Sequence, residues 1–304
     1  LVVGMMNQAP ARWINGKGEL LTMAPGYGQG AAWGANASGI IVGTHTNDLF
    51  GIDLPVYWTS AEVAAQFLPN PGGASGAAFA VNGSGTIVGA AAPNGTLQAV
   101  RWDDAQSNPV VIGPLRGGFG GEARAINSAG DIAGRTSFPD FSSRAMLYLA
   151  AEDQLINLGV LGRSYSEARG VNALRQVVGV SSTDGGEVHA FLWQDGQMLD
   201  LNDLVKASNE PFLYVTQAVA IDDTGRIAAE VVVGDVPDGP WRIARLDPCA
   251  PADLDCNGVI DGADLGLQLA QWGPCGSAPC DGDLNRDGVV NGADLGMLLS
   301  SWSQ

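Results

Sequence analysis

A segment of fourteen residues recurs along the first part of this chain and constrains its fold more than any other feature. It reads Gly-Ala-Ala-Trp-Gly-Ala-Asn-Ala-Ser-Gly-Ile-Ile-Val-Gly at 30–43, and copies follow at 76–89, 121–134, 166–179 and, in degraded form, 216–229. Self-similarity at such a period indicates an array of equal supersecondary units. The polar residue at the seventh position recurs at intervals of 46, 45, 45 and 50 residues, at Asn36, Asn82, Asn127, Asn172 and Asp222.

Each unit of the array is predicted to contain four short antiparallel strands. In the third copy we expect strands at 123–127, 131–136, 145–149 and 155–158. The Asn that begins the first turn can bond its own backbone, and the Gly three residues later accepts a positive φ, which predicts a hairpin with a bulge there. Four antiparallel strands in about 45 residues are typical of a β-propeller blade. A β-solenoid is the alternative, although its coils are normally much shorter.

The two ends of the array lack complementary strands. The chain opens with Val2-Val3-Gly4, which matches the second strand of a unit, and continues with strands at 11–13 and 20–23. The last unit supplies strands at 219–221, 226–232 and 241–245 and lacks a fourth. We therefore expect a mostly β protein whose residues 1–246 form a six-bladed propeller, with residues preceding Leu1 completing its first and last blades.

A second repetition, near the C-terminus, places oxygen-bearing side chains at the spacing of an EF-hand loop. The twelve residues 253–264 return as 283–294. Calcium takes about six to eight oxygens, which such a loop supplies from positions 1, 3, 5, 7, 9 and 12. The predicted ligands, with a main-chain carbonyl at position 7, are Asp253, Asp255, Asn257, Val259, Asp261 and Asp264 in the first loop and Asp283, Asn285, Asp287, Val289, Asn291 and Asp294 in the second.

Two further features favour calcium over a solvated acidic turn, which has a similar composition. Gly258 and Gly288 stand at position 6, where the loop turns sharply. Each loop also runs into a helical pattern of apolar residues, at Leu265, Leu269 and Trp272 and again at 295, 299 and 302. We therefore expect two bound calcium ions.

The duplicated loop and helix resembles the type I dockerin family over residues 249–304, and a short Pro/Ala linker at 247–252 overlaps its start. The resemblance implies a small α-helical domain that folds on calcium and docks into a cohesin domain of a scaffold or cell-surface protein. In the family the dockerin recognises its cohesin partner largely through loop positions 10 and 11, which often carry Ser-Thr. Those positions are Gly262 and Ala263 in the first loop and Gly292 and Ala293 in the second.

All four cysteines lie within this stretch, at 249, 256, 275 and 280. A domain this small buries little apolar surface and is commonly stabilised by a metal or by disulfides. Four cysteines allow three pairings, which the sequence does not separate. A zinc site is the alternative, but the spacings C-x6-C and C-x4-C differ from those of structural zinc. Disulfides imply an oxidising compartment, so we expect a secreted, extracellular protein that can also be attached to a cell surface.

The charge of the chain argues against nucleic acid as a partner. Its 304 residues include 15 Lys and Arg against 32 Asp and Glu, and both the array and the C-terminal stretch are acidic. Binding of nucleic acid depends on clustered basic residues that neutralise phosphates. The sequence also contains no uninterrupted apolar run long enough to span a bilayer.

The array resembles the extracellular HAF repeat family over nearly all of residues 1–246. The motifs that carry the resemblance include Ala125-Ile-Asn-Ser-Ala-Gly130, Val177-Val-Gly179 and His189-Ala-Phe-Leu-Trp-Gln-Asp-Gly196. The resemblance implies a location outside the cell and no particular activity. His45 and His189 are the two histidines of the chain, and neither sits in a nucleophile motif. We expect His189 to be a surface residue at a strand edge.

Two groups of residues are candidates for a site on the propeller. Glu122 and Glu167 occupy equivalent positions in successive units and are catalytic candidates, because a glycosidase needs two carboxylates. Alternatively, each is a solvated neighbour of an arginine two residues further along the same strand face. The residues at this arginine position, two residues after the glutamate position of each unit, can stack on and bind a sugar, or they pack between blades. They are Trp33, Phe79, Arg124 and Arg169.

The sequence therefore favours a secreted, non-catalytic propeller that binds a glycan or a protein and is held to its partner by a calcium-dependent module. The alternative is a carbohydrate-active enzyme, a glycoside hydrolase or lyase that acts in polysaccharide breakdown. Dockerins commonly carry such modules, and Glu122 with Glu167 would then be the catalytic pair.

Overall fold

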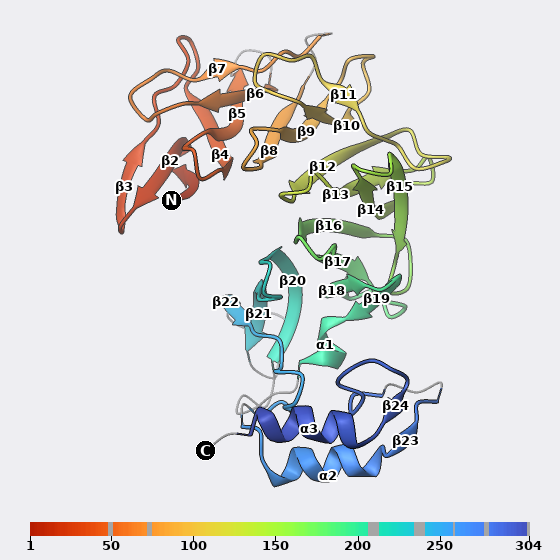
Figure 1. Ribbon diagram of the computed structural model, residues 1–304. Coiled ribbons are helices and arrows are strands. Elements are labelled where there is room, and N and C mark those ends of the chain that lie inside the picture. The colour runs from red at the N-terminus through yellow and green to blue at the C-terminus, as the bar shows by residue number, and fades with distance from the viewer. Residues whose placement is uncertain are drawn as a thin grey trace. The chain divides into compact units, whose positions relative to one another are not determined.

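The computed structural model describes residues 1–47, 51–71, 75–205, 213–233, 241–257, 259–276 and 280–302. These residues form two compact units, of which unit 1 ends at Leu246 and unit 2 begins at Asp247. Unit 1 is built of β-strands with one short helix, and unit 2 contains two helices and a small two-stranded sheet (Figure 1). Every helix among the described residues is too short or too polar to cross a bilayer.

Unit 1 consists of six antiparallel sheets that follow one another along the chain. The first has three strands, β1 (Val2–Met6), β2 (Ala9–Ile14) and β3 (Lys17–Leu20). The next two have four strands each, namely β4 (Gln29–Ala35), β5 (Ile41–Asn47), β6 (Ile52–Trp58) and β7 (Gln66–Phe67), then β8 (Ala77–Val81), β9 (Ile87–Ala91), β10 (Gln98–Trp102) and β11 (Val110–Val111).

Two further four-stranded sheets and a last sheet of three strands complete unit 1. The four-stranded sheets contain β12 (Gly120–Ile126), β13 (Ile132–Ser137), β14 (Ser143–Leu149) and β15 (Gln154–Gly159), then β16 (Ser166–Val171), β17 (Val177–Ser182), β18 (Val188–Gln194) and β19 (Gln197–Asp200). Helix α1 (Leu201–Leu204) leads to the last sheet, which contains β20 (Leu213–Ile221), β21 (Ile227–Val233) and β22 (Trp241–Leu246).

The six sheets are the blades of a β-propeller, so the predicted fold of the array is confirmed. In each blade the strand order follows the chain order, and the four-stranded blades place their first strand on the inner side of the arc of blades (Figure 1). The first and last blades have the three strands each that the sequence predicts. Their completion by residues preceding Leu1 stays a prediction.

The apolar core of unit 1 lies between neighbouring blades. Val42 and Tyr57 of the second blade pack with Ile87 and Trp102 of the third in one buried cluster, and similar clusters follow between later blades. The indole N–H of Trp102 donates to the carbonyl of Pro69 over 2.8 Å. The repeated aromatic residue at the end of the third strand therefore fixes a blade to the preceding connection.

The predicted turn after the first strand is present, but the bulge lies elsewhere. Asn36 accepts a hydrogen bond from the N–H of Ile40 over 3.0 Å, and Gly39 has a φ of 88°. The strand register shifts inside the first strand itself, two to three residues before this turn, where one residue has no partner on the second strand. The unmatched residues at this position in blades two to six are Trp33, Phe79, Arg124, Arg169 and Val219, and blade six has a second one at Thr216.

In blades two to five the second strand carries glycine beside the bulge, whereas blade six has Ala229 there. A Cβ atom on Gly89 would lie 1.9 Å from the carbonyl oxygen of Ala77, which no side chain allows. Gly43, Gly134 and Gly179 have the same contact at 2.0 Å. Bulges redirect a side chain out of the strand pattern, and here they do so in five successive blades.

One predicted strand of the first blade is displaced. The sequence predicts a strand at 20–23, whereas β3 ends at Leu20. Asn15 and Gly16 have φ values of 51° and 78°, the geometry of a two-residue hairpin turn, so β3 starts directly after β2. Leu21 then leaves the sheet and is buried.

Unit 2 contains α2 (Gly262–Ala270) and α3 (Gly292–Ser300), with β23 (Gly273–Pro274) paired to β24 (Val289–Val290). Disulfides join Cys249 to Cys256 and Cys275 to Cys280, with Cα atoms 5.3 and 5.8 Å apart. All four cysteines are thereby paired, so the zinc alternative is wrong. Disulfides of this kind indicate an oxidising environment.

The predicted apolar stripe of the two helices is only partly buried. Leu265 packs against a small core of Ala252, Ile260 and Leu298. The next members of the stripe point outward, because the first-turn carboxylate of each helix and the residue four positions later occupy the inner face. Leu269, Trp272, Leu299 and Trp302 are therefore exposed.

Candidate functional site

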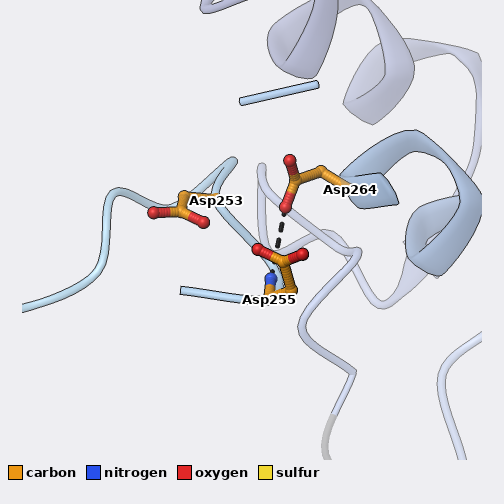
Figure 2. A group of neighbouring side chains, drawn as sticks. All are labelled: Asp253, Asp255 and Asp264. Atoms are coloured by element: carbon orange, nitrogen blue, oxygen red, sulfur yellow. Dashed lines mark hydrogen bonds between the residues drawn. The ribbon is translucent and has the colours of Figure 1, made fainter. Parts of the chain in front are cut away.

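The first loop of unit 2 brings three carboxylates together. Asp253, Asp255 and Asp264 each offer an oxygen within 4.8 Å of the others (Figure 2). Two of these residues are buried, and Asp255 is half-buried. Like charges this close repel unless a cation lies between them, so an all-oxygen set of this kind fits a hard divalent ion. Gly258 lies outside the described residues.

Asp264 is held in place by the main chain of its own loop. Its carboxylate accepts hydrogen bonds from the N–H groups of Leu254, Asp255 and Asp261 over 2.6, 3.2 and 2.8 Å. Burial works to raise the pKa of Asp264, but these bonds outweigh it and leave the pKa below its usual value. The carboxyl at position 12 is therefore charged and oriented, as a cation ligand requires.

The remaining predicted ligands of this loop order its backbone. Asp253 accepts from the N–H of Asn257 over 3.0 Å, and Asn257 accepts from the N–H of Val259 over 2.7 Å. Asp261 caps α2 by accepting from the N–H of Ala263 over 2.7 Å. The side chains at positions 1, 5 and 9 thus fix the loop backbone by accepting its N–H groups.

The second loop repeats this arrangement with less charge. Asp283 accepts from the N–H of Asp287 over 3.1 Å, and the buried Asp294 accepts from Asn285 and Asn291 over 3.1 and 2.8 Å. The carbonyl of Val289 accepts from the side chain of Asn291 over 3.1 Å. Asparagine stands at positions 3 and 9, where the first loop has aspartate. A divalent ion would therefore be attracted less strongly to the second loop.

The predicted partner-binding residues are exposed in the first turns of α2 and α3. Gly262 and Ala263 open α2, and Gly292 and Ala293 open α3. Apolar side chains on these helices and directly after them are exposed as well. Trp272 is 50% exposed and Trp302 37%. Large exposed apolar groups on both helices are typical of a docking surface.

On the propeller, the bulge residues form a continuous row across blades two to five. The rings of Trp33 and Phe79 lie 6.4 Å apart, edge to face, and the guanidinium of Arg124 lies 4.2 Å above the ring of Phe79. Arg169 follows in the next blade and contacts Gln217. Trp33 is 54% exposed. The predicted ligand-binding residues of successive blades are thus neighbours, with the exposed Trp33 at one end of the row and Arg124 and Arg169, both in ion pairs with glutamate, at the other.

Glu122 and Glu167 converge, but each is held by arginines. The side chain of Arg135 lies 3.0 Å from Glu122 and 3.4 Å from Glu167, and therefore joins the two carboxylates. Arg124 approaches the same two residues at 2.5 and 3.5 Å. The interpretation of the glutamates as solvated is wrong, because Glu167 is only 5% exposed. Their pairing with Arg124 and Arg169 is confirmed.

Arg135 is the member of this cluster that the sequence interpretation missed. It stands directly opposite Glu122 in the β12–β13 hairpin. The register of that hairpin follows from the Asn127 turn, so the cross-strand pair could have been found from the sequence. Its contact with Glu167 of the next blade could not, because that contact depends on how blades pack.

No family model and no curated protein matches this chain. Among solved structures, TolB from Agrobacterium tumefaciens superposes with a TM-score of 0.52 at 10% identity, covering 71% of this chain and 76% of that one. TolB from Acinetobacter baumannii has a TM-score of 0.48 at 15% identity and covers 64% of this chain, but this chain spans only 49% of that protein. A gluconolactonase from Xanthomonas campestris has a TM-score of 0.41 at 15% identity, with coverages of 73% and 81%. The likeness to the Agrobacterium protein is one of fold.

Proposed function

We propose that this chain is a secreted HAF-repeat propeller whose inner strands bind a glycan or a protein without breaking it down, and that unit 2 is a dockerin-like module that attaches it to a partner. The observation that carries the proposal is the repetition in unit 2. Both loops cap their helix with the residue at position 9, and both bury the carboxylate at position 12. Such a pair of loops suits two calcium ions.

The partner is proposed to be a cohesin-like domain or a surface scaffold protein. The small residues at the start of each helix allow close approach of another backbone, and the exposed leucines and tryptophans supply apolar area. The acidic character of unit 2 favours a partner face that is apolar at its centre and basic at its rim.

Calcium titration of the full chain tests the attachment module. We expect two binding events by calorimetry, and loss of helical circular dichroism on chelation while the β signal of unit 1 remains. Capture of a cohesin-bearing protein should require calcium, and it should weaken in the double variant Trp272→Ala/Trp302→Ala. Equal capture with and without chelator would refute the attachment proposal.

A glycan array with the full chain tests the propeller. Trp33→Ala should lower binding at least tenfold if its open face stacks on sugar. Trp241→Ala is the matched control, because Trp241 is also exposed, at 58%, but stands on β22 away from the bulge row. An equal loss in both variants would argue against a site at the inner strands.

The second candidate is a glycoside hydrolase or lyase, favoured by the convergence of Glu122 and Glu167 through Arg135. Against it, both carboxylates lie in ion pairs with arginine, so their oxygens already have partners other than a substrate. Incubation with polysaccharides and measurement of released reducing ends or unsaturated sugars decides the matter. Release that is abolished in Glu122→Gln would replace the binding proposal with the enzymatic one.

A further inference from the structure

Three side chains outside both candidate sites form a hydrogen-bonded chain between blades five and six. His189 lies on β18, Asp200 is the last residue of β19, and Tyr214 lies near the start of β20. The Nδ1 atom of His189 lies 2.5 Å from a carboxylate oxygen of Asp200, and its Nε2 atom lies 2.9 Å from the hydroxyl of Tyr214. The expectation that His189 is a surface residue is wrong, because its side chain is only 12% exposed.

The partners of the imidazole determine which of its nitrogens carries the proton. An ionised carboxylate only accepts hydrogen bonds, so Nδ1 donates to Asp200. The other oxygen of Asp200 accepts from the N–H and the side chain of Asn202 over 2.9 and 3.0 Å, which fixes the carboxylate. Nε2 is then a bare acceptor, and the hydroxyl of Tyr214 donates to it. A hydroxyl, an imidazole and an orienting carboxylate in this order can activate the hydroxyl as a nucleophile.

Other tyrosines of the described chain have different partners. The hydroxyl of Tyr148 donates to Asp153 over 2.8 Å, and that of Tyr165 donates to Glu167 over 3.1 Å. A carboxylate stabilises the neutral phenol, whereas a neutral imidazole can take its proton. Tyr214 is also 46% exposed, so a substrate can reach it. Tyr214 is therefore both accessible to a substrate and hydrogen-bonded to a base, His189.

We propose that Tyr214 is a nucleophile that accepts the acyl group of a neutral carboxylic ester. In the first step the phenol proton moves to Nε2 of His189, the phenol oxygen attacks the ester carbonyl, and the alcohol leaves with that proton. In the second step water gives a proton to Nε2 and attacks the tyrosyl ester, and Tyr214 leaves as the phenol after recovering that proton. The adjacent carboxylate and the net charge of −17 disfavour anionic phosphate esters.

Acylation by p-nitrophenyl acetate, followed by peptide mass spectrometry, tests the proposal on the full chain. We expect one acetyl group on Tyr214. Its rate of acetylation should be at least tenfold higher than that of Tyr148 or Tyr165. It should also be at least tenfold higher than that of Tyr214 in the His189→Gln variant. Tyr214→Phe, which keeps the ring, should remove the burst of p-nitrophenolate. Tyr148→Phe is the matched control and should leave the burst unchanged.

Two results would overturn the proposal. One is acetylation of Tyr214 at the same rate in the wild type and in His189→Gln. That result would mean that these hydrogen bonds only hold the two blades together. The other is modification of Tyr214 by p-nitrophenyl phosphate in preference to the acetate, which would contradict the substrate class. Asp200→Asn should slow acetylation of Tyr214 while the melting temperature stays within a few degrees of the wild type, and Asp200→Glu, which restores a carboxylate, should recover part of the rate, a combination that a purely structural role does not produce.

Discussion

The side-chain amide of Asn36 donates a hydrogen bond of 3.0 Å to the main-chain carbonyl of Asn82, the residue that takes its place in the next blade. The same bond recurs from blades three, four and five to the following blade. Its distances are 3.3, 3.0 and 3.0 Å for the donors Asn82, Asn127 and Asn172. The last acceptor is the carbonyl of Asp222, whose own side chain has no N–H to continue the series. One residue type thus shapes the turn and also joins the blades.

The first prediction concerns this series. Asn36→Asp keeps the oxygen that accepts from Ile40 but removes the donor, so the carbonyl of Asn82 loses a buried partner. We expect a loss of about 1–3 kcal/mol in the free energy of unfolding, measured with urea. Asp222→Asn is the control and should change it by less than about 0.5 kcal/mol, because that side chain is solvent-exposed. Equal effects would show that the inter-blade bond contributes nothing.

The second prediction concerns the glycine opposite each bulge. Gly89→Ala would place a Cβ 1.9 Å from the carbonyl of Ala77, so the hairpin must shift or the bulge must be lost. We expect a loss of about 3 kcal/mol or more, seen as a lower urea midpoint. Gly83→Ala is the matched control, since no atom lies within 4 Å of a Cβ there. A tolerated Gly89→Ala would contradict the steric argument.

The period and the turn residues were sufficient to predict the blades of unit 1, because each blade is a local meander. In the third copy, strands at 123–127 and 145–149 were predicted; β14 covers the second, and β12 covers the first except for Asn127. The bulge was misplaced because the register shift lies inside the first strand, between Ala123 and Ala125, and not at the turn. Contacts between blades, such as that of Arg135 with Glu167, depend on packing and leave no local signal.

In unit 2 the loops followed from spacing, whereas the buried face of the helices did not. The apolar pattern with Leu269 predicts a helix but not its buried face, where the carboxylate of Asp264 and the side chain of Gln268 lie. The disulfide pairing also needed coordinates, since all three pairings were open in the sequence. In both cases a polar or covalent constraint prevailed over the apolar pattern.

The third prediction concerns His45, which is fully buried among Tyr27, Trp58 and Phe67 with neither ring nitrogen hydrogen-bonded. Burial lowers its pKa from 6.5 to about 4, so between these values the unfolded chain binds a proton that the folded chain does not. Stability should therefore fall as the pH drops below 6.5, by about 2 kcal/mol at pH 5, and this loss should level off below about pH 4.

Urea unfolding of the wild type and of His45→Leu at pH 7 and pH 5 measures this contribution. The variant should keep its stability better between the two pH values, by the amount attributed to the imidazole. Leucine has no polar atoms to leave unpaired and fills a similar volume. The variant should therefore be at least as stable as the wild type at pH 7. An identical pH dependence in both proteins would exclude His45 as the titrating group.

The fourth prediction concerns the carboxylates of the first loop. Asp253→Asn removes one of three clustered charges, and we expect calcium affinity of one site to fall at least tenfold while the other site is unchanged. Isothermal titration calorimetry separates the two sites. Asp281→Asn is the matched control, because Asp281 is an acidic residue of unit 2 outside both loops. Parallel losses in the two variants would mean that only net charge matters.

The fifth prediction concerns Arg135. Arg135→Met keeps much of the side-chain volume but leaves Glu122 and Glu167, which are largely buried, with one cation fewer. We expect a loss of about 2–3 kcal/mol in the free energy of unfolding. Arg101→Met, which breaks the ion pair with the exposed Asp103, should cost less than about 1 kcal/mol. Equal costs would show that the cluster is no more than a set of surface ion pairs.

The disulfide between Cys249 and Cys256 also has a mechanical consequence. The chain enters unit 2 at Asp247, so a pulling force on it reaches Cys249 and crosses the covalent bridge to Cys256. Residues 250–255, which include Asp253 and Asp255, therefore do not carry the pulling force. A protein pulled through this junction would therefore load its helices before it stretched the first three residues of this loop.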